Sequence, residues 1–261
     1  FESSVIKVAF YASHERKRIE IERRGSNAQS LMNVIQNLSP NQEVLNGPFK
    51  GMIYPYMLSY GSSLTPKILG TYEKELHPLF DNLLARSYAN IIDIGCAEGY
   101  YAVGLALRIP SAKVYAYDTD YKALNACIEM AKVNNVSDRI ITGLFCNTES
   151  LRKFNFSSKT LIICDCEGFE IDLFNDDVIP FLSTCDLLIE MHDCFNIEIS
   201  SVLRNRLCRS HSITSFYSLD DIAKALTYEV PELLGYSLAE KKELLAENRA
   251  SIMEWFYLTP H

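Results

Sequence analysis

No apolar run in this sequence approaches the ~20 residues that a membrane-spanning helix needs, so we expect no membrane contact. The chain also lacks any Cys-x-x-Cys pair, and its eight cysteines lie scattered through apolar segments. Free, buried cysteines in a reducing compartment fit that distribution better than disulfides do. The pattern therefore predicts a cytoplasmic protein.

A continuous basic patch, the usual mark of a nucleic-acid binder, is missing as well. The formal net charge is −8, and the short basic run at His14–Arg18, continued by Arg23 and Arg24, is interleaved with acidic residues. These features favour a small-molecule substrate and no nucleic acid. Hydrophobic residues make up 48 % of the 261 residues and charged residues 22 %, which is ordinary for a globular protein with its own core.

Two regions of the chain differ in pattern. Residues 1–64 predict an N-terminal α+β appendage, with strands at Ser4–Ala12 and Arg16–Glu22 and a helix at Ala28–Leu38. Residues 65–261 predict a separate, larger domain. The appendage is either purely structural or a lid or dimer contact over the active site. The pattern does not separate these roles, so a homodimer stays open.

In the larger region, short apolar strands alternate with helices. Such alternation predicts an α/β fold, a doubly wound and mostly parallel sheet covered on both faces, and the late strand pair brings it to seven strands. The expected strands are Asn90–Gly95, Ala112–Asp118, Arg139–Phe145, Thr160–Asp165, Asp186–Met191, Ser212–Tyr217 and Ser251–Leu258. The expected helices are Thr65–Arg86, with some irregularity near Gly70, and Gly99–Ile109, Tyr121–Val133, Ile197–Arg209, Asp220–Leu226 and Leu238–Asn248.

The segment Asp93–Gly99 joins the first of these strands to the following helix and reads Asp-Ile-Gly-Cys-Ala-Glu-Gly. Glycines allow a sharp turn and a close approach of a ligand to the backbone, and the helix N-terminus offers free N–H groups. The spacing of Gly95 and Gly99 does not fit the G-x-G-x-x-G of dinucleotide sites, and no Gly-Lys-Ser/Thr of a P-loop follows. The next strand ends in Asp118, whose carboxylate can accept both hydroxyls of a ribose.

This loop resembles motif I of class I S-adenosylmethionine-dependent methyltransferases, roughly Asp/Glu-x-Gly-x-x-x-Gly. The resemblance implies the methyltransferase sheet and S-adenosylmethionine as cofactor. It implies that the loop wraps the methionine part, that the first acid positions the amino group, and that the acid after the second strand binds the ribose. The predicted cofactor-binding residues are Asp93, Gly95, Cys96, Ala97, Gly99, Asp118, Cys146 and Asp165.

Ionisable residues also follow the fourth and fifth strands. Because the carboxyl ends of parallel strands share one edge, these side chains should converge there. The run Asp165–Glu170 reads Asp-Cys-Glu-Gly-Phe-Glu, and this pattern resembles FkbM-like methyltransferases, which methylate oxygens of small molecules and sugars. The converging side chains are Asp165, Glu167, Glu190, His192 and Asp193.

Two mechanisms fit this group. Either His192, Glu190 or Glu167 takes a proton from an acceptor hydroxyl, or Asp165, Glu190 and His192 hold a divalent Mg, Mn, Fe or Zn ion that activates it. His211 is a weaker candidate for the same site.

We therefore expect a methyltransferase acting on an oxygen of a small molecule or sugar, with or without a metal. The alternatives are a cofactor-binding regulator without turnover, and a protein or RNA methyltransferase. Methylation of bases or glutamine is disfavoured, because Asp165–Gly168 stands where such enzymes carry Asn/Asp-Pro-Pro-Tyr/Phe.

Overall fold

The structure is a computed structural model, and it describes residues 29–261. The expected strands at Ser4–Ala12 and Arg16–Glu22 and the basic run that begins at His14 lie outside the described residues. Within residues 29–261, no helix combines the length and the apolar character that crossing a membrane requires.

A seven-stranded sheet with the order β3-β2-β1-β4-β5-β7-β6 forms the centre of the molecule. Strands β1 to β5 run parallel, and β7 lies antiparallel between β5 and β6. This arrangement confirms the predicted fold, the doubly wound sheet of class I methyltransferases. The strands are β1 (Asn90–Ile94), β2 (Lys113–Tyr117), β3 (Ile140–Gly143), β4 (Thr160–Cys164), β5 (Asp186–Met191), β6 (His211–Tyr217) and β7 (Glu254–Pro260).

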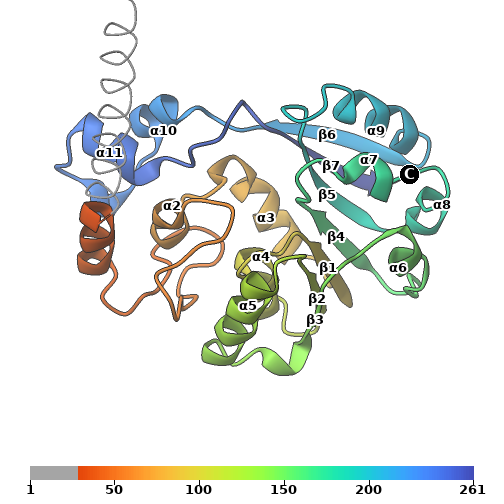
Figure 1. Ribbon diagram of the computed structural model, residues 1–261, viewed down its shortest axis with the longest axis horizontal. Helices are drawn as coiled ribbons and strands as arrows, with labels where there is room; N and C mark the ends of the chain where they lie inside the picture. The colour runs from red at the N-terminus through yellow and green to blue at the C-terminus, as the bar shows by residue number, and fades with distance from the viewer. Residues whose placement is uncertain (1–28) are drawn as a thin grey trace, which may run out of the picture.

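Helices cover both faces of this sheet, with α4 and α5 on one side and α6, α8 and α9 on the other (Figure 1). Strand side chains alternate between the faces, so Ile91 packs into the first core and Ile92 into the second. The helices are α2 (Leu64–Leu69), α3 (His77–Leu84), α4 (Tyr100–Arg108), α5 (Tyr121–Val133), α6 (Thr148–Arg152), α7 (Glu170–Leu173), α8 (Ile179–Leu182), α9 (Ile199–Leu207), α10 (Asp221–Thr227) and α11 (Leu238–Leu245). Single 3₁₀ turns span Lys74–Leu76, Ser137–Arg139 and Pro231–Leu233.

The single helix expected over Thr65–Arg86 is wrong, because α2 and α3 are separated by a turn. Gly70 adopts φ 70° against the backbone of Asn46, and Glu73 also has a positive φ of 47°. The turn places Tyr72 beside the cavity described below. Local periodicity hinted at the irregularity but could not reveal a distant partner earlier in the chain.

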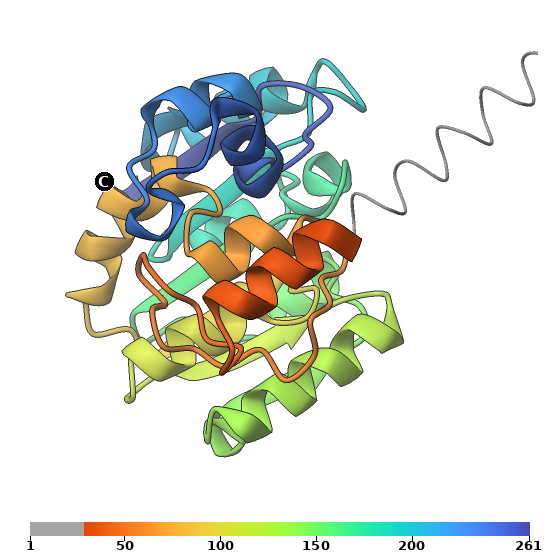
Figure 2. The ribbon, with the colours of Figure 1, turned by 90° about the vertical axis from the view of Figure 1, so that its left-hand side faces the viewer.

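The described part of the N-terminal region packs against the same core as α4. Ile35, Val44 and Phe49 are buried in the cluster that includes the side chains of α4, and the Phe49 and Tyr100 rings meet edge to face at 5.1 Å. Figure 2 shows this part, in red and orange, on the side of the molecule that also carries α4 and α5. The division at residue 64 stays a prediction.

Gly95 and Gly235 offer a test of what holds the end of β1. Both have positive φ (82° and 88°), but a Cβ at Gly95 would collide with the carbonyl oxygen of Asp165, whereas a Cβ at Gly235 would meet nothing within 4 Å. We expect Gly235→Ala to cost roughly 1–2 kcal/mol of unfolding free energy from backbone strain. Gly95→Ala should cost about 1–3 kcal/mol more, because β4 must move. Urea denaturation measures both, and equal losses would contradict the predicted role of the Asp165 contact.

Candidate active site

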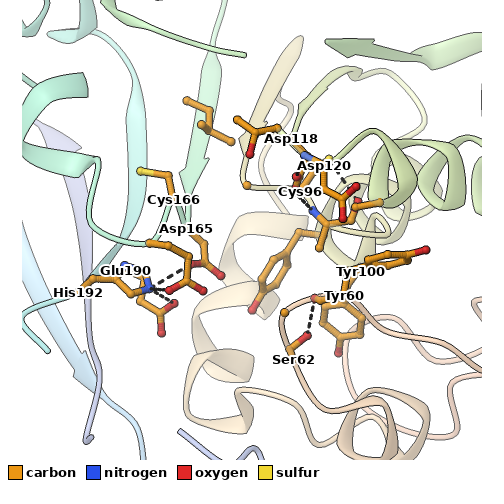
Figure 3. Close-up of a pocket in the computed structure, with 18 of the residues that line it drawn as sticks. Tyr60, Ser62, Cys96, Tyr100, Asp118, Asp120, Asp165, Cys166, Glu190 and His192 are labelled. Carbon is orange, nitrogen blue, oxygen red and sulfur yellow. Dashed lines mark hydrogen bonds and ion pairs between the residues drawn. The ribbon is translucent and has the colours of Figure 1, made fainter. Parts of the chain in front are cut away.

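A cavity of about 530 Å³ lies at the carboxyl edge of the parallel strands. The loops after β1, β2, β4 and β5 line it, because parallel strands end at the same edge of a sheet. Figure 3 shows two groups of side chains facing each other across this space. Asp118 and Cys96 lie on one side, and Asp165, Glu190 and His192 lie on the other.

The loop after β1 is held in shape by the end of β2. The N–H groups of Gly95 and Cys96 both donate to the Tyr117 carbonyl oxygen, at 2.8 and 2.9 Å. Asp118 accepts the Ala97 N–H on one carboxylate oxygen at 2.9 Å and the Asp120 N–H on the other at 2.8 Å. Each oxygen keeps a further acceptor position for a ligand hydroxyl. The carboxylate therefore shapes the loop as well as facing the cavity.

The predicted cofactor residues fall into two groups. Asp93 and Gly99 lie behind the cavity wall, and Asp93 is buried with one carboxyl oxygen lacking a hydrogen-bond partner among the described residues. Burial, reinforced by the charge of Asp165, raises the pKa of Asp93 to about 8. Whether Asp93 positions a ligand directly or through the loop stays a prediction. The predicted cofactor residues that do line the cavity are Gly95, Cys96, Ala97, Asp118, Cys146 and Asp165.

Glu98, which sequence reasoning passed over, anchors an N-terminal segment to this loop. Its carboxylate accepts from Lys67 Nζ at 2.6 Å, from Ser59 Oγ at 3.0 Å and from the Tyr60 N–H at 2.9 Å. Burial favours the protonated form, but the Lys67 charge and these hydrogen bonds outweigh it, so the pKa of Glu98 is lowered. The anchored segment then contributes Tyr60, Gly61 and Ser62 to the cavity wall. No local sequence signal marks a partner 31 residues away.

Across the cavity, the predicted acidic residues and histidine do converge. Cys164 pairs in register with Ile189, which brings the next residues of β4 and β5 side by side. His192 Nε2 lies 3.3 Å from Asp165 Oδ1, 3.4 Å from Glu167 Oε2 and 3.5 Å from Glu190 Oε2. The catalytic and metal-binding roles of these residues stay predictions.

Glu170 is a further member of this group that the sequence did not single out. Its buried carboxylate lies 2.8 Å from His192 Nδ1. Burial lowers the pKa of His192, but the bond to Glu170 and the charges of Asp165 and Glu167 outweigh it, so the net pKa is raised. The last Glu of the Asp-x-Glu-Gly-x-Glu pattern was the available signal.

Two expected members lie elsewhere. Asp193 turns away, because β5 ends at Met191 and the alternation of side chains stops there. Its carboxylate instead accepts the Ser200 N–H at 2.8 Å, near the start of α9. His211 begins β6 at the opposite edge of the sheet, where its Nε2 lies 3.1 Å from the Cys185 carbonyl oxygen. Neither residue reaches the cavity.

Arg249 closes the cavity from the C-terminal side. The predicted closing strand began earlier, but β7 begins at Glu254, and the preceding segment passes along the cavity. Arg249 donates to Glu190, to Glu73 and, at 2.8 Å, to Glu247. Burial raises the pKa of Glu190, Asp165 raises it further, and Arg249 only partly opposes this. One guanidinium thus serves three buried carboxylates.

Part of this chain is similar to known methyltransferases. Residues 76–158 match the family model described as Methyltransferase small domain. Ribosomal RNA large subunit methyltransferase G of Photobacterium profundum is 33% identical over 78 residues, which are 30% of this chain and 20% of that protein. Ribosomal protein L11 methyltransferase of Acinetobacter baylyi is 44% identical over 54 residues, 21% of this chain and 18% of that protein. The chain thus spans about a fifth of the length of these curated relatives.

Among solved structures, a SAM-dependent methyltransferase from Geobacter sulfurreducens in complex with S-adenosyl-L-homocysteine is similar, with a TM-score of 0.45 and 14% identity. The match covers 72% of this chain and 91% of that chain. The matched part of the chain is thus similar to methyltransferases, which agrees with the predicted class. The FkbM-like subfamily stays a prediction.

The expectation of a small-molecule substrate and no nucleic acid is contradicted. Both curated relatives are named for ribosomal macromolecules, one an RNA and the other a protein. The expectation rested on the lack of a continuous basic patch and on the net charge of −8. That sum averages over the whole surface and does not describe the charge where an acceptor docks.

The Lys67–Glu98 pair gives a test of the anchor. The two side chains are 3% and 2% exposed, so removing one partner leaves a buried, unpaired charge. We expect Lys67→Met to cost about 3–5 kcal/mol of unfolding free energy. The double variant Lys67→Met/Glu98→Gln should lose clearly less than the sum of the two single losses. Urea denaturation of the parent and the three variants measures this coupling, and additive losses would show that the pair does not hold the segment.

Proposed function

We propose that this protein is an S-adenosylmethionine-dependent methyltransferase that modifies a macromolecular acceptor. The observation that carries the proposal is the placement of the Gly95–Gly99 loop, braced by Asp118, opposite a group of acid–base side chains in one cavity. A ligand bound along the loop would reach toward Asp165, Glu190 and His192. Binding and chemistry would then share one space.

The residues present suit this cofactor. Gly95 lets the loop pack directly on Asp165, because even a methyl group there would collide with the Asp165 carbonyl oxygen, and the residue also lines the cavity. Leu144, Phe145 and Cys146 offer an apolar surface for an adenine ring near the end of β3. When bound, S-adenosylmethionine supplies a methyl group activated by a positively charged sulfonium. The carboxylates of the cavity wall would stabilise that charge.

Glu167 is the side chain that we assign as proton acceptor. Of the three predicted candidates, the His192 and Glu190 side chains are only 4% and 2% exposed. The Glu167 side chain is 63% exposed and free to meet an entering acceptor. Partial burial, followed by the charge of Asp165, raises its pKa, which makes it a stronger proton acceptor than an ordinary carboxylate.

The acceptor is proposed from the relatives and from the shape of the cavity mouth. The relatives are named for ribosomal RNA and a ribosomal protein. The side chains of Leu144, Phe145 and Phe195 line the cavity and yet are 59%, 52% and 65% exposed. Exposed apolar groups around a site are typical of a surface that docks a large partner.

Transfer of a radiolabelled methyl group from the cofactor tests the proposal directly. Purified protein is incubated with ribosomal RNA and, separately, with ribosomal proteins, and the label is followed by gel and scintillation counting. We expect label in one of the two fractions. Cofactor binding with no label in either fraction would favour the regulator without turnover.

Asp118 and Asp120 both lie at the end of β2, which allows a paired test of cofactor binding. Asp118→Ala should weaken S-adenosylhomocysteine binding by about 2 kcal/mol, because charge-assisted hydrogen bonds to the ligand and the loop are lost. Asp120 lines the cavity too, but its carboxylate caps α5 by accepting the Lys122 N–H, so Asp120→Ala should lower stability by about 1 kcal/mol and weaken affinity less than Asp118→Ala does. Calorimetry that assigns the larger loss of affinity to Asp120→Ala would refute the assignment.

Glu167→Gln tests the proton acceptor while keeping the shape of the side chain. We expect the rate of methyl transfer to fall by about 10²–10⁴-fold, with cofactor affinity unchanged. Single-turnover assays separate the chemical step from product release. Glu198→Gln serves as a matched control on the exposed surface and should keep the full rate. A Glu167→Gln rate equal to that of the parent protein would exclude Glu167 as the base.

A further inference from the structure

Three side chains at the carboxyl ends of β4 and β5 each present an atom of the kind that binds metal ions. One ligand atom each from Asp165, Glu190 and His192 lie within 4.8 Å of one another. The Glu190 and His192 side chains are 2% and 4% exposed, and that of Asp165 is 29% exposed. The group thus sits in the wall of the cavity, partly open to it.

Each buried member is held from outside and keeps one atom directed inward. Oε1 of Glu190 accepts a hydrogen bond from Arg249, and Oε2 points toward His192. Nδ1 of His192 lies 2.8 Å from the Glu170 carboxylate, and Nε2 points toward Asp165. Oδ1 of Asp165 is buried and has no hydrogen-bond partner among the described residues. The inward atoms face one another, because His192 Nε2 lies 3.3 Å from Asp165 Oδ1 and 3.5 Å from Glu190 Oε2.

The Glu170–His192 contact is the feature that distinguishes this group from a chance gathering of acids. A carboxylate on one ring nitrogen fixes the tautomer, so the other nitrogen presents its lone pair in a set direction. Histidines that bind metals almost always have such a partner. Glu170 is fully buried, and the Gly168 N–H also holds its carboxylate, at 3.2 Å. The ring of His192 is thus oriented toward Asp165 and Glu190.

The excess of negative charge around His192 also favours the binding of a cation. Four carboxylates surround His192, and Arg249, which pairs with one of them, Glu190, also pairs with Glu73 and Glu247. Lys67 and Arg249 are the lysine and arginine that line the cavity within the described residues, and Lys67 is paired with Glu98. Buried carboxylates without compensation are costly. A divalent ion would remove that cost.

We infer that Asp165, Glu190 and His192 bind a divalent metal ion and that Glu170 orients His192 for it. Two carboxylates and one imidazole suit Mn²⁺ or another first-row ion better than Mg²⁺, which prefers oxygen ligands. Three protein ligands leave coordination positions open toward the cavity, as a catalytic site requires. The use of the ion on an acceptor group rests on the proposed function, but its binding does not.

The experiment uses the full chain, freed of metal with EDTA and desalted, without cofactor or acceptor. Mn²⁺ is titrated and followed by the electron paramagnetic resonance signal of the free ion. We expect one saturable site per chain, which His192→Ala and Asp165→Asn abolish. Glu170→Gln should weaken binding by about 10- to 100-fold, because it keeps the side-chain shape but lowers the basicity of the ring. Asp193→Asn, which alters a neighbouring carboxylate that turns away, should bind as the parent protein does.

Circular dichroism confirms that each variant is folded, and the visible spectrum of Co²⁺ gives a second readout of the imidazole ligand. The inference is overturned if the parent protein shows no saturable binding of Mn²⁺, Zn²⁺ or Co²⁺ at millimolar concentration. It is also overturned if folded His192→Ala binds the ion as tightly as the parent. Because neither result depends on methyl transfer, a failure of the metal site and a failure of the proposed function are distinguishable.

Discussion

The end of β1 rests directly on the end of β4, and the arrangement of the site depends on this contact. The Asp165 N–H donates to the Ile94 carbonyl oxygen at 2.9 Å, while the Asp165 carbonyl oxygen occupies the place of a Cβ on Gly95. The loop that starts at Gly95 and the acidic run that starts at Asp165 therefore cannot separate. Backbone geometry fixes how far the cofactor loop lies from the acid–base group, and side chains only complete that arrangement.

The sequence predicted the parts of this structure that depend on neighbours along the chain. Strand periodicity, the glycine spacing and the acids after β4 and β5 are local signals, and each matches its element closely. The pairs that complete the site join distant segments, as Lys67 to Glu98 and Arg249 to Glu190 do. Short helices such as Glu170–Leu173 have too few residues for a period to emerge. Asp193 was misplaced because alternation holds only while the strand continues.

The net charge of the chain and the ion pairs around the cavity describe different properties of this protein. The net charge of −8 describes the chain as a whole, and it led to the wrong class of acceptor. Around the cavity, by contrast, individual carboxylates have individual partners, and the buried Glu170 and Glu98 have lowered pKa values although burial opposes this. The acidic character of the site is thus organised by a few cations and amides. What the site accepts follows from these local pairings.

Arg249 also has a consequence for how the protein is made. Its three carboxylate partners come from the segment after α2, from β5 and from its own segment near residue 247. During synthesis the first five strands and the cofactor loop leave the ribosome before this guanidinium does. A chain synthesised only as far as β5 would hold the loop but leave Glu73 and Glu190 without the cation that pairs with them. The charges of the cavity wall are thus balanced only after Arg249 has joined the fold.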